Sequence, residues 1–88
     1  MDLLTSIHEL SNSRINIFPN PAIDVINIEV EGNLNYMTKL FDLNGKLIQT
    51  TVNSSQLKIA SLTSGLYLLE IKDLQSSRKI VERIVIGH

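Results

Sequence analysis

Cysteine and tryptophan are absent from this 88-residue sequence, and it contains no long hydrophobic run. Without cysteine there is neither a disulfide framework nor a thiolate metal site. No apolar stretch approaches the roughly 20 residues that a membrane-spanning helix needs, so we expect no direct membrane insertion. The formal net charge is −1, and this lack of a basic excess argues against a nucleic acid partner.

The first residues also lack the features of an export leader. The stretch from Met1 to Ser6 has neither a positively charged start nor a long apolar segment, so it is not a secretory signal peptide. Residues 1–14 are rich in serine and asparagine, and Ser11-Asn12-Ser13 would end a helix early. We therefore predict a linker over residues 1–14 and one folded domain over residues 15–88. We expect the natural protein to continue upstream.

Hydrophobic residues make up 43% of the sequence, which is typical of a globular domain, and from Ile15 onward they alternate with polar residues. In the segment 24–30, for example, Ile26 and Ile28 fall on one face while Glu29 falls on the other, as in a strand with one wet side. Turn signals recur every 8–12 residues. The pattern predicts an all-β antiparallel sandwich of about seven short strands, at residues 15–18, 24–30, 37–43, 46–52, 57–59, 66–72 and 79–86.

Asn44-Gly45 lies between two β-rich segments and predicts a hairpin with a type I′ turn, in which both central residues have positive φ. Phe41 and Leu43 are expected to face inward on the first strand of this hairpin. The nearly continuous apolar segment 66–72 predicts a central strand that is buried on both faces.

No constellation of catalytic or metal-binding residues stands out. The two histidines, His8 and His88, lie at opposite ends of the chain, so neither has companions at the spacing of metal ligands. No serine occurs in a nucleophile-elbow sequence, and no triad can be assembled without a central histidine. We expect no metal, no cofactor and no enzymatic activity.

Four motifs occur in one order: Ile17-Phe18-Pro19-Asn20-Pro21-Ala22, then the segment 40–48 (LFDLNGKLI), then the segment 59–68 (IASLTSGLYL), and finally Lys79-Ile80-Val81. In this order and at this spacing, the chain from Ile15 to Ile86 resembles the type A C-terminal sorting domain of the type IX, or Por, secretion system of Gram-negative bacteria.

The resemblance implies an immunoglobulin-like sandwich that directs an upstream cargo protein, attached in cis, from the periplasm through an outer-membrane translocon. It further implies that a cell-surface sorting peptidase removes the domain, with the cut expected before Ile15. The cargo would then reside at the cell surface or outside the cell.

The candidate recognition residues are those of the motifs: Pro19, Asn20, Pro21, Ala22, Asn44, Gly45, Lys46, Leu62, Gly65, Tyr67, Lys79, Ile80 and Val81. Each can equally serve the fold, because prolines stiffen corners and glycines adopt positive φ. For the last strand we favour recognition, since a terminal strand with unpaired backbone groups can extend the sheet of a partner. Such edge strands also allow weak self-association.

A carbohydrate-binding or adhesive module is the alternative function. Such modules display aromatic platforms, whereas this chain has two tyrosines and two phenylalanines. Tyr36 and Tyr67 are expected to be half-buried strand residues instead.

Overall fold

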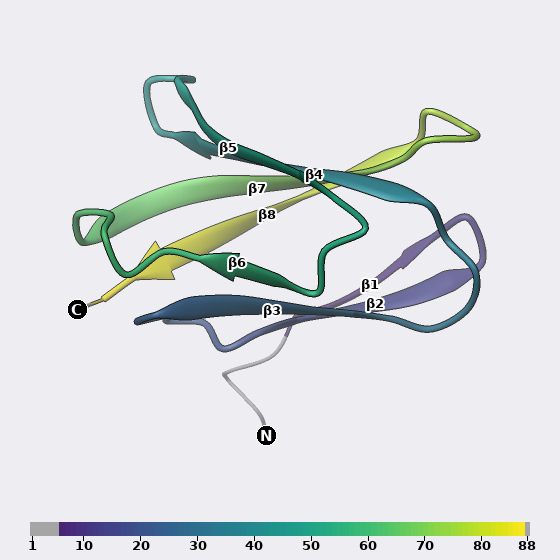
Figure 1. Cartoon of the computed structure of the whole chain (residues 1–88), viewed down its shortest axis with the longest axis horizontal. Coiled ribbons are helices and arrows are strands. Elements are labelled where there is room, and N and C mark those ends of the chain that lie inside the picture. The colour runs from purple at the N-terminus through teal and green to yellow at the C-terminus, as the bar shows by residue number, and fades with distance from the viewer. Residues whose placement is uncertain (1–5, 88) are drawn as a thin grey trace.

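In the part of the chain that the structure describes, eight β-strands form two four-stranded antiparallel sheets that pack face to face (Figure 1). A computed structural model describes residues 6–87, and within this range the chain forms no helix. The strands are β1 (Ser6–Leu10), β2 (Ser13–Phe18), β3 (Val25–Val30), β4 (Tyr36–Asp42), β5 (Leu47–Val52), β6 (Gln56–Lys58), β7 (Gly65–Asp73) and β8 (Lys79–Ile86). The predicted all-β sandwich is confirmed, with one strand more than expected.

Sheet 1 has the order β1-β2-β3-β6 and sheet 2 the order β5-β4-β7-β8. In immunoglobulin-like sandwiches strands A, B and E lie in one sheet, and strands C, F and G, often with C′, lie in the other. Strands β2, β3 and β6 take the places of A, B and E. Strands β5, β4, β7 and β8 take the places of C′, C, F and G. Strand β1 is an addition at the edge of sheet 1.

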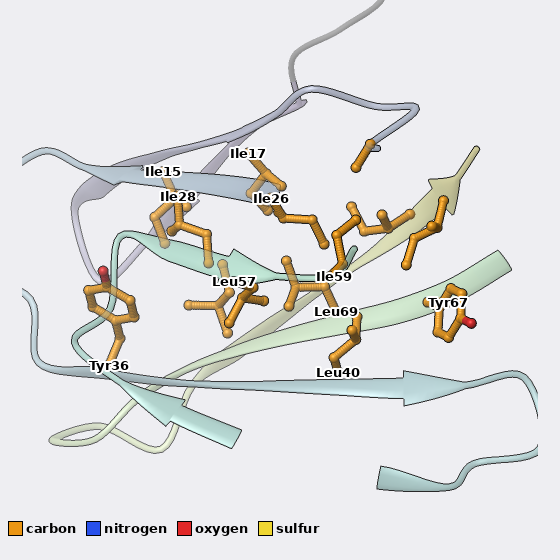
Figure 2. Packing of buried hydrophobic residues seen from close by; sticks show 14 of the residues in the cluster. Ile15, Ile17, Ile26, Ile28, Tyr36, Leu40, Leu57, Ile59, Tyr67 and Leu69 are labelled. Carbon is orange, nitrogen blue, oxygen red and sulfur yellow. The ribbon is translucent and has the colours of Figure 1, made fainter. Parts of the chain in front are cut away.

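The core lies between the sheets and consists mostly of isoleucine and leucine (Figure 2). On β2 and β3 every second residue points inward, so that Ile15, Ile17, Ile26 and Ile28 are at most 1% exposed. β-Branched side chains pack well on a pleated, half-buried surface. Among the residues that the structure describes, the buried apolar ones are Leu10, Ile15, Ile17, Ala22, Ile26, Ile28, Tyr36, Leu40, Leu57, Ile59, Tyr67, Leu69, Ile71, Ile84 and Ile86.

The predicted inward face of β4 is wrong. Leu40 is fully buried, so Phe41, as the next residue of the strand, points to the outer face. Leu43 lies in the turn after the strand and is 61% exposed. The adjacent pair Leu40-Phe41 gives no indication of which residue faces inward, and packing against the opposite sheet decides it.

The prediction that β7 is buried on both faces is also wrong. Tyr67, Leu69 and Ile71 are buried, whereas Leu66 is 38% exposed and Leu68 is half-buried. Strand β7 is central within sheet 2, but among the described residues no second layer covers the outer face of that sheet. An apolar run in a two-layer sandwich therefore still alternates between a dry and a wet side.

Residues Ser6–Leu10, expected as part of a linker, instead form β1 and pair with β2 in the register Leu10↔Ser13. The two residues between them, Ser11 and Asn12, both have positive φ, at 51° and 64°, as a type I′ hairpin turn requires. The polar Ser-Asn-Ser segment is thus a tight turn and not the end of a structured segment. The remainder of the predicted linker, residues 1–5, lies outside the described residues.

The hairpin at Asn44-Gly45 is confirmed, but its turn type differs from the prediction. Gly45 has φ +84°, whereas Asn44 does not have a positive φ. The amide of Gly45 donates to the carbonyl of Asp42 at 3.0 Å, and the Asp42 side chain accepts from the amides of Asn44 and Lys46 at 2.9 Å each. This is a three-residue loop in which a type I turn is followed by a left-handed glycine.

Replacing Gly45 with alanine is expected to lower the free energy of unfolding by about 1–2 kcal/mol, because a Cβ is disfavoured in the left-handed region. Gly87→Ala is the matched control: the φ of Gly87 is not positive, and an added Cβ would make an ordinary contact with Pro21 at 3.7 Å. Urea unfolding of both variants checks this. Equal losses would contradict the strain argument.

Candidate functional site at one end of the sandwich

Most of the motif residues lie together at one end of the sandwich, at the left of Figure 1. Three connections meet there: the β2–β3 corner, the β4–β5 turn and the β6–β7 connection. The end of β8 joins them, since Gly65 at the start of β7 lies opposite Ile86. We call this region the motif end. The other predicted residues, Lys79, Ile80 and Val81, lie at the opposite end of β8.

The corner formed by residues 19–22, here called the PNPA corner, pairs with the outer edge of β8. Both of its proline peptide bonds are cis. The amide of Ala22 donates to the carbonyl of Val85 at 2.8 Å, and the amide of Gly87 donates to the carbonyl of Ala22 at 2.9 Å. These bonds form a parallel bridge between Ala22 and Ile86. The corner, which connects β2 and β3 of sheet 1, is thereby attached to the edge of sheet 2.

Asn20 extends this pairing with its side chain. Its Oδ1 accepts from the amide of Val85 at 3.0 Å, and its Nδ2 donates to the carbonyl of Arg83 at 3.2 Å. The expectation of an unpaired terminal edge is therefore wrong for the half of β8 from Arg83 to its end. None of the corner's hydrogen bonds reaches Lys79–Val81.

Asn20→Ala is expected to lower the free energy of unfolding by about 1–2 kcal/mol, because two hydrogen bonds to β8 are lost and water replaces them in part. The amide of Val85 should exchange faster with solvent. Asn33→Ala, an exposed asparagine in the β3–β4 loop, is the matched control and should change little. Hydrogen exchange followed by NMR measures both; unchanged exchange at Val85 would contradict the pairing.

The two tyrosines serve the fold. Tyr67 is 6% exposed, and its hydroxyl donates to the carbonyl of Thr63 at 2.7 Å, which fixes the β6–β7 connection. Tyr36 is 7% exposed, its hydroxyl donates to the carbonyl of Ser54 at 2.8 Å, and burial raises its pKa. Both are more buried than expected, so neither ring is displayed as a stacking platform for sugars. No observation on the described residues favours the carbohydrate-binding alternative.

The end opposite the motif end is held together by residues that the sequence analysis did not single out. Ser11 and Ser76 donate hydrogen bonds to Oδ2 of Asp73, at 2.5 and 2.7 Å, and the amide of Gln75 donates to Oδ1 at 2.9 Å. Led by the bond from Ser11, these contacts lower the pKa of Asp73 to about 2. They join the β1–β2 turn to the β7–β8 turn across 62 residues of sequence.

Because the pKa of Asp73 is lowered in the folded chain, we expect the stability of the domain to depend on pH. Its pKa is about 2 in the folded chain against an ordinary 3.8, so its contribution is fully present above pH 4 and is lost as the pH falls through 2. Asp73→Asn and Ser11→Ala should therefore both make the acid decline of stability between pH 4 and pH 2 shallower. Urea unfolding over this range, with an NMR titration of the Asp73 carboxyl, measures it. A pKa of Asp73 unchanged by Ser11→Ala would contradict the assignment.

A second link at the edges of the two sheets joins β1 to β8. Nε2 of His8 lies 2.7 Å from Oε1 of Glu82. This histidine, which falls in the predicted linker, thus contacts the strand that carries the last motif. His88 lies outside the described residues. No sequence signal could have paired residues so far apart, because only the packing of the sheets brings their edges together.

Features of other functional classes are missing from residues 6–87. No three histidine, aspartate or glutamate side chains gather there as a metal site requires, and no helix in that range could span a membrane. An open groove at the end opposite the motif end is lined by residues that include Asn16, Glu29 and Asn53, and none of the motif residues contributes to it.

The fold and the motif end define a small antiparallel sandwich module whose terminal strand is clamped by a proline-rich corner. The family model described as "Secretion system C-terminal sorting domain" matches residues 16–87. The chain belongs to this family, the sorting domains of the Por secretion system, which are non-catalytic and imply export through the outer membrane. No curated protein matches the chain. The family match begins within β2, continues to the end of β8 and does not include β1.

Proposed function

We propose that this domain is the address by which the type IX secretion system carries an upstream cargo protein across the outer membrane. The observation that carries the proposal is the family match over residues 16–87. The gathering of three motif segments at one end of the sandwich supports it, since one face of a partner could contact all of them at once. The partners are the outer-membrane translocon and the sorting peptidase.

The motif residues divide into those that build the fold and those that are accessible to a partner. Ala22 and Tyr67 are buried, and Asn20 is engaged with β8. Leu62 and Ile80 are half-buried against the core, and Pro19 is half-buried as well. These six residues shape the fold. The motif residues exposed to solvent are Pro21, Asn44, Gly45, Lys46, Gly65, Lys79 and Val81. We propose that recognition rests on these exposed residues.

The expected removal of the domain is proposed to occur before Ser6. A peptidase binds its substrate as an accessible extended segment, but Ser6–Leu10 is already paired with β2. A cut within β1 would require this strand to open first. Intact-mass measurement of the released domain tests this: its first residue should be Ser6 or an earlier one. A domain that begins within residues 7–14 would contradict the placement.

The direct test fuses residues 1–88 to a periplasmic reporter in a host that carries the secretion system. The reporter should become accessible to external protease, whereas the same reporter without the domain should stay in the periplasm. A second control uses a host that lacks the translocon, in which the fusion should also be retained. Retention in the competent host, with the domain folded, would refute the address.

A further inference from the structure

The outer face of sheet 2 carries an apolar patch at the motif end. Phe41 lies opposite Leu47 on one neighbouring strand and opposite Leu68 on the other, and Leu66 lies opposite Val85. We call these five residues the outer patch. Directly opposed side chains on one face of a sheet interact, and Leu66 and Leu68 are successive residues on the same face of β7. The five residues therefore lie next to one another on this face. Leu47 is 47% exposed, and Leu66 and Val85 are 38% exposed each.

Positive charge lies beside the outer patch and along the rest of the same face. Arg83 is opposite Leu68, whereas Lys72 and Lys79 face each other at the far end of β7 and β8. Four cationic side chains lie on the outer face of sheet 2 and a fifth in the β4–β5 turn: Lys39, Lys72, Lys79, Arg83 and Lys46. The carboxylate on this face is Glu70, which lies 3.8 Å from the Nζ of Lys79. The whole chain has a net charge of −1 and contains eight lysine and arginine residues, four of which lie on this one face.

We propose that the outer face of sheet 2 docks an acidic protein surface with an apolar centre, on a component of the export machinery. This inference rests on the proposed function and names the contact surface for it. Complementary charge steers association and selects the partner, while the apolar centre excludes water. The patch brings together two of the four motif segments, since 40–48 supplies Phe41 and Leu47 and 59–68 supplies Leu66 and Leu68. Val85 comes from β8, the strand that the last motif begins.

A protein partner fits this face better than an anionic membrane. Membrane-interface surfaces rely on exposed tryptophan and tyrosine, but the chain has no tryptophan, and Tyr36 and Tyr67 are buried. A second copy is also a poorer match. A second copy could offer its acidic outer face of sheet 1, which carries carboxylates such as Glu9 and Glu29. Because the two paired faces would then differ, each copy would bind another in turn, and the assembly would grow as an open filament.

The test reverses charge next to the outer patch in the full-length fusion. The double variant Lys46→Glu/Arg83→Glu changes two exposed side chains and should leave the melting temperature of the domain nearly unchanged. Surface delivery should fall about tenfold or more, because like charges would meet the acidic partner. The matched control is Arg14→Glu/Lys58→Glu, two exposed residues of sheet 1, which should deliver within about twofold of the original chain. Leu66→Gln tests the apolar part and should also reduce delivery.

Each outcome bears on the proposal. Normal delivery of both the charge variant and Leu66→Gln would overturn the docking surface while the secretion address stands. If the original fusion is not delivered, the address fails, and the docking surface fails with it. If the domain binds phosphatidylglycerol vesicles and the charge variant abolishes this binding, the partner is a membrane and not a protein. If the domain self-associates in analytical sedimentation and the same variant abolishes this association, the partner is a second copy of the domain.

Discussion

Ile84→Ala should lower the free energy of unfolding by about 2–5 kcal/mol, the usual cost of truncating a large buried aliphatic side chain. Ile84 is fully buried and lies opposite Tyr67 on the neighbouring strand. A domain of this size has a total stability of only about 5–15 kcal/mol, so the variant should retain little reserve. Urea unfolding monitored by circular dichroism gives the value directly.

Val81→Ala is the matched control on the same strand. Val81 is 51% exposed and points to the opposite face, so its truncation should change stability by no more than about 0.5 kcal/mol. Comparable losses in the two variants would contradict the assigned faces of β8. The Ile84→Ala variant also informs the function: if the folded surface is the address, delivery of the reporter should fall for this variant at 37 °C. Full delivery of an unfolded variant would instead favour a linear signal.

Removing residues 1–14 should cost a large part of the stability, although those residues precede the family match. Burial of Leu10, which is 4% exposed, contributes about 1.5–3 kcal/mol by itself. The truncation also removes the hydrogen bonds between β1 and β2 and the bond from Ser11 to Asp73. The midpoints of thermal and urea unfolding should both fall for residues 15–88 relative to the full chain.

A pair of point variants in the full chain separates the packing of β1 from other effects of the truncation. Leu10→Ala should lower the free energy of unfolding by about 2–5 kcal/mol. Ile7→Ala, on the same strand but 64% exposed, should be near neutral. If residues 15–88 unfold at the same urea concentration as the full chain, neither β1 nor the first two residues of β2 add to the stability.

Local patterns were sufficient to predict most of the strands. Alternation in the segment 24–30 placed Ile26 and Ile28 together on the dry face, as observed, because the side-chain period of a strand is two wherever one face is dry. The hairpin at Asn44-Gly45 was predicted because glycine tolerates positive φ, but the same dipeptide is compatible with several turns. Its turn type depended on hydrogen bonds to Asp42.

The wrong predictions came from segments whose local pattern is ambiguous. Leu40-Phe41 offers two adjacent apolar residues, and only the opposing sheet selects Leu40 for the core. Segment 66–72 is apolar throughout, yet the sandwich has two layers and leaves one face of β7 open. Ser11-Asn12 was interpreted as part of a linker because polar residues are common in linkers and turns alike.

The sequence by itself determined that this chain is a β-sandwich and, through the order and spacing of its motifs, the family to which it belongs. Only the tertiary structure decided that the PNPA corner pairs with β8 and that Ser11 donates a hydrogen bond to Asp73. It also decided that the outer patch and several cationic side chains lie on the same face of sheet 2. The reason is physical. Alternation and turn chemistry act between residues close in sequence, whereas contacts across 60 residues or more depend on how two sheets with many competing registers finally pack.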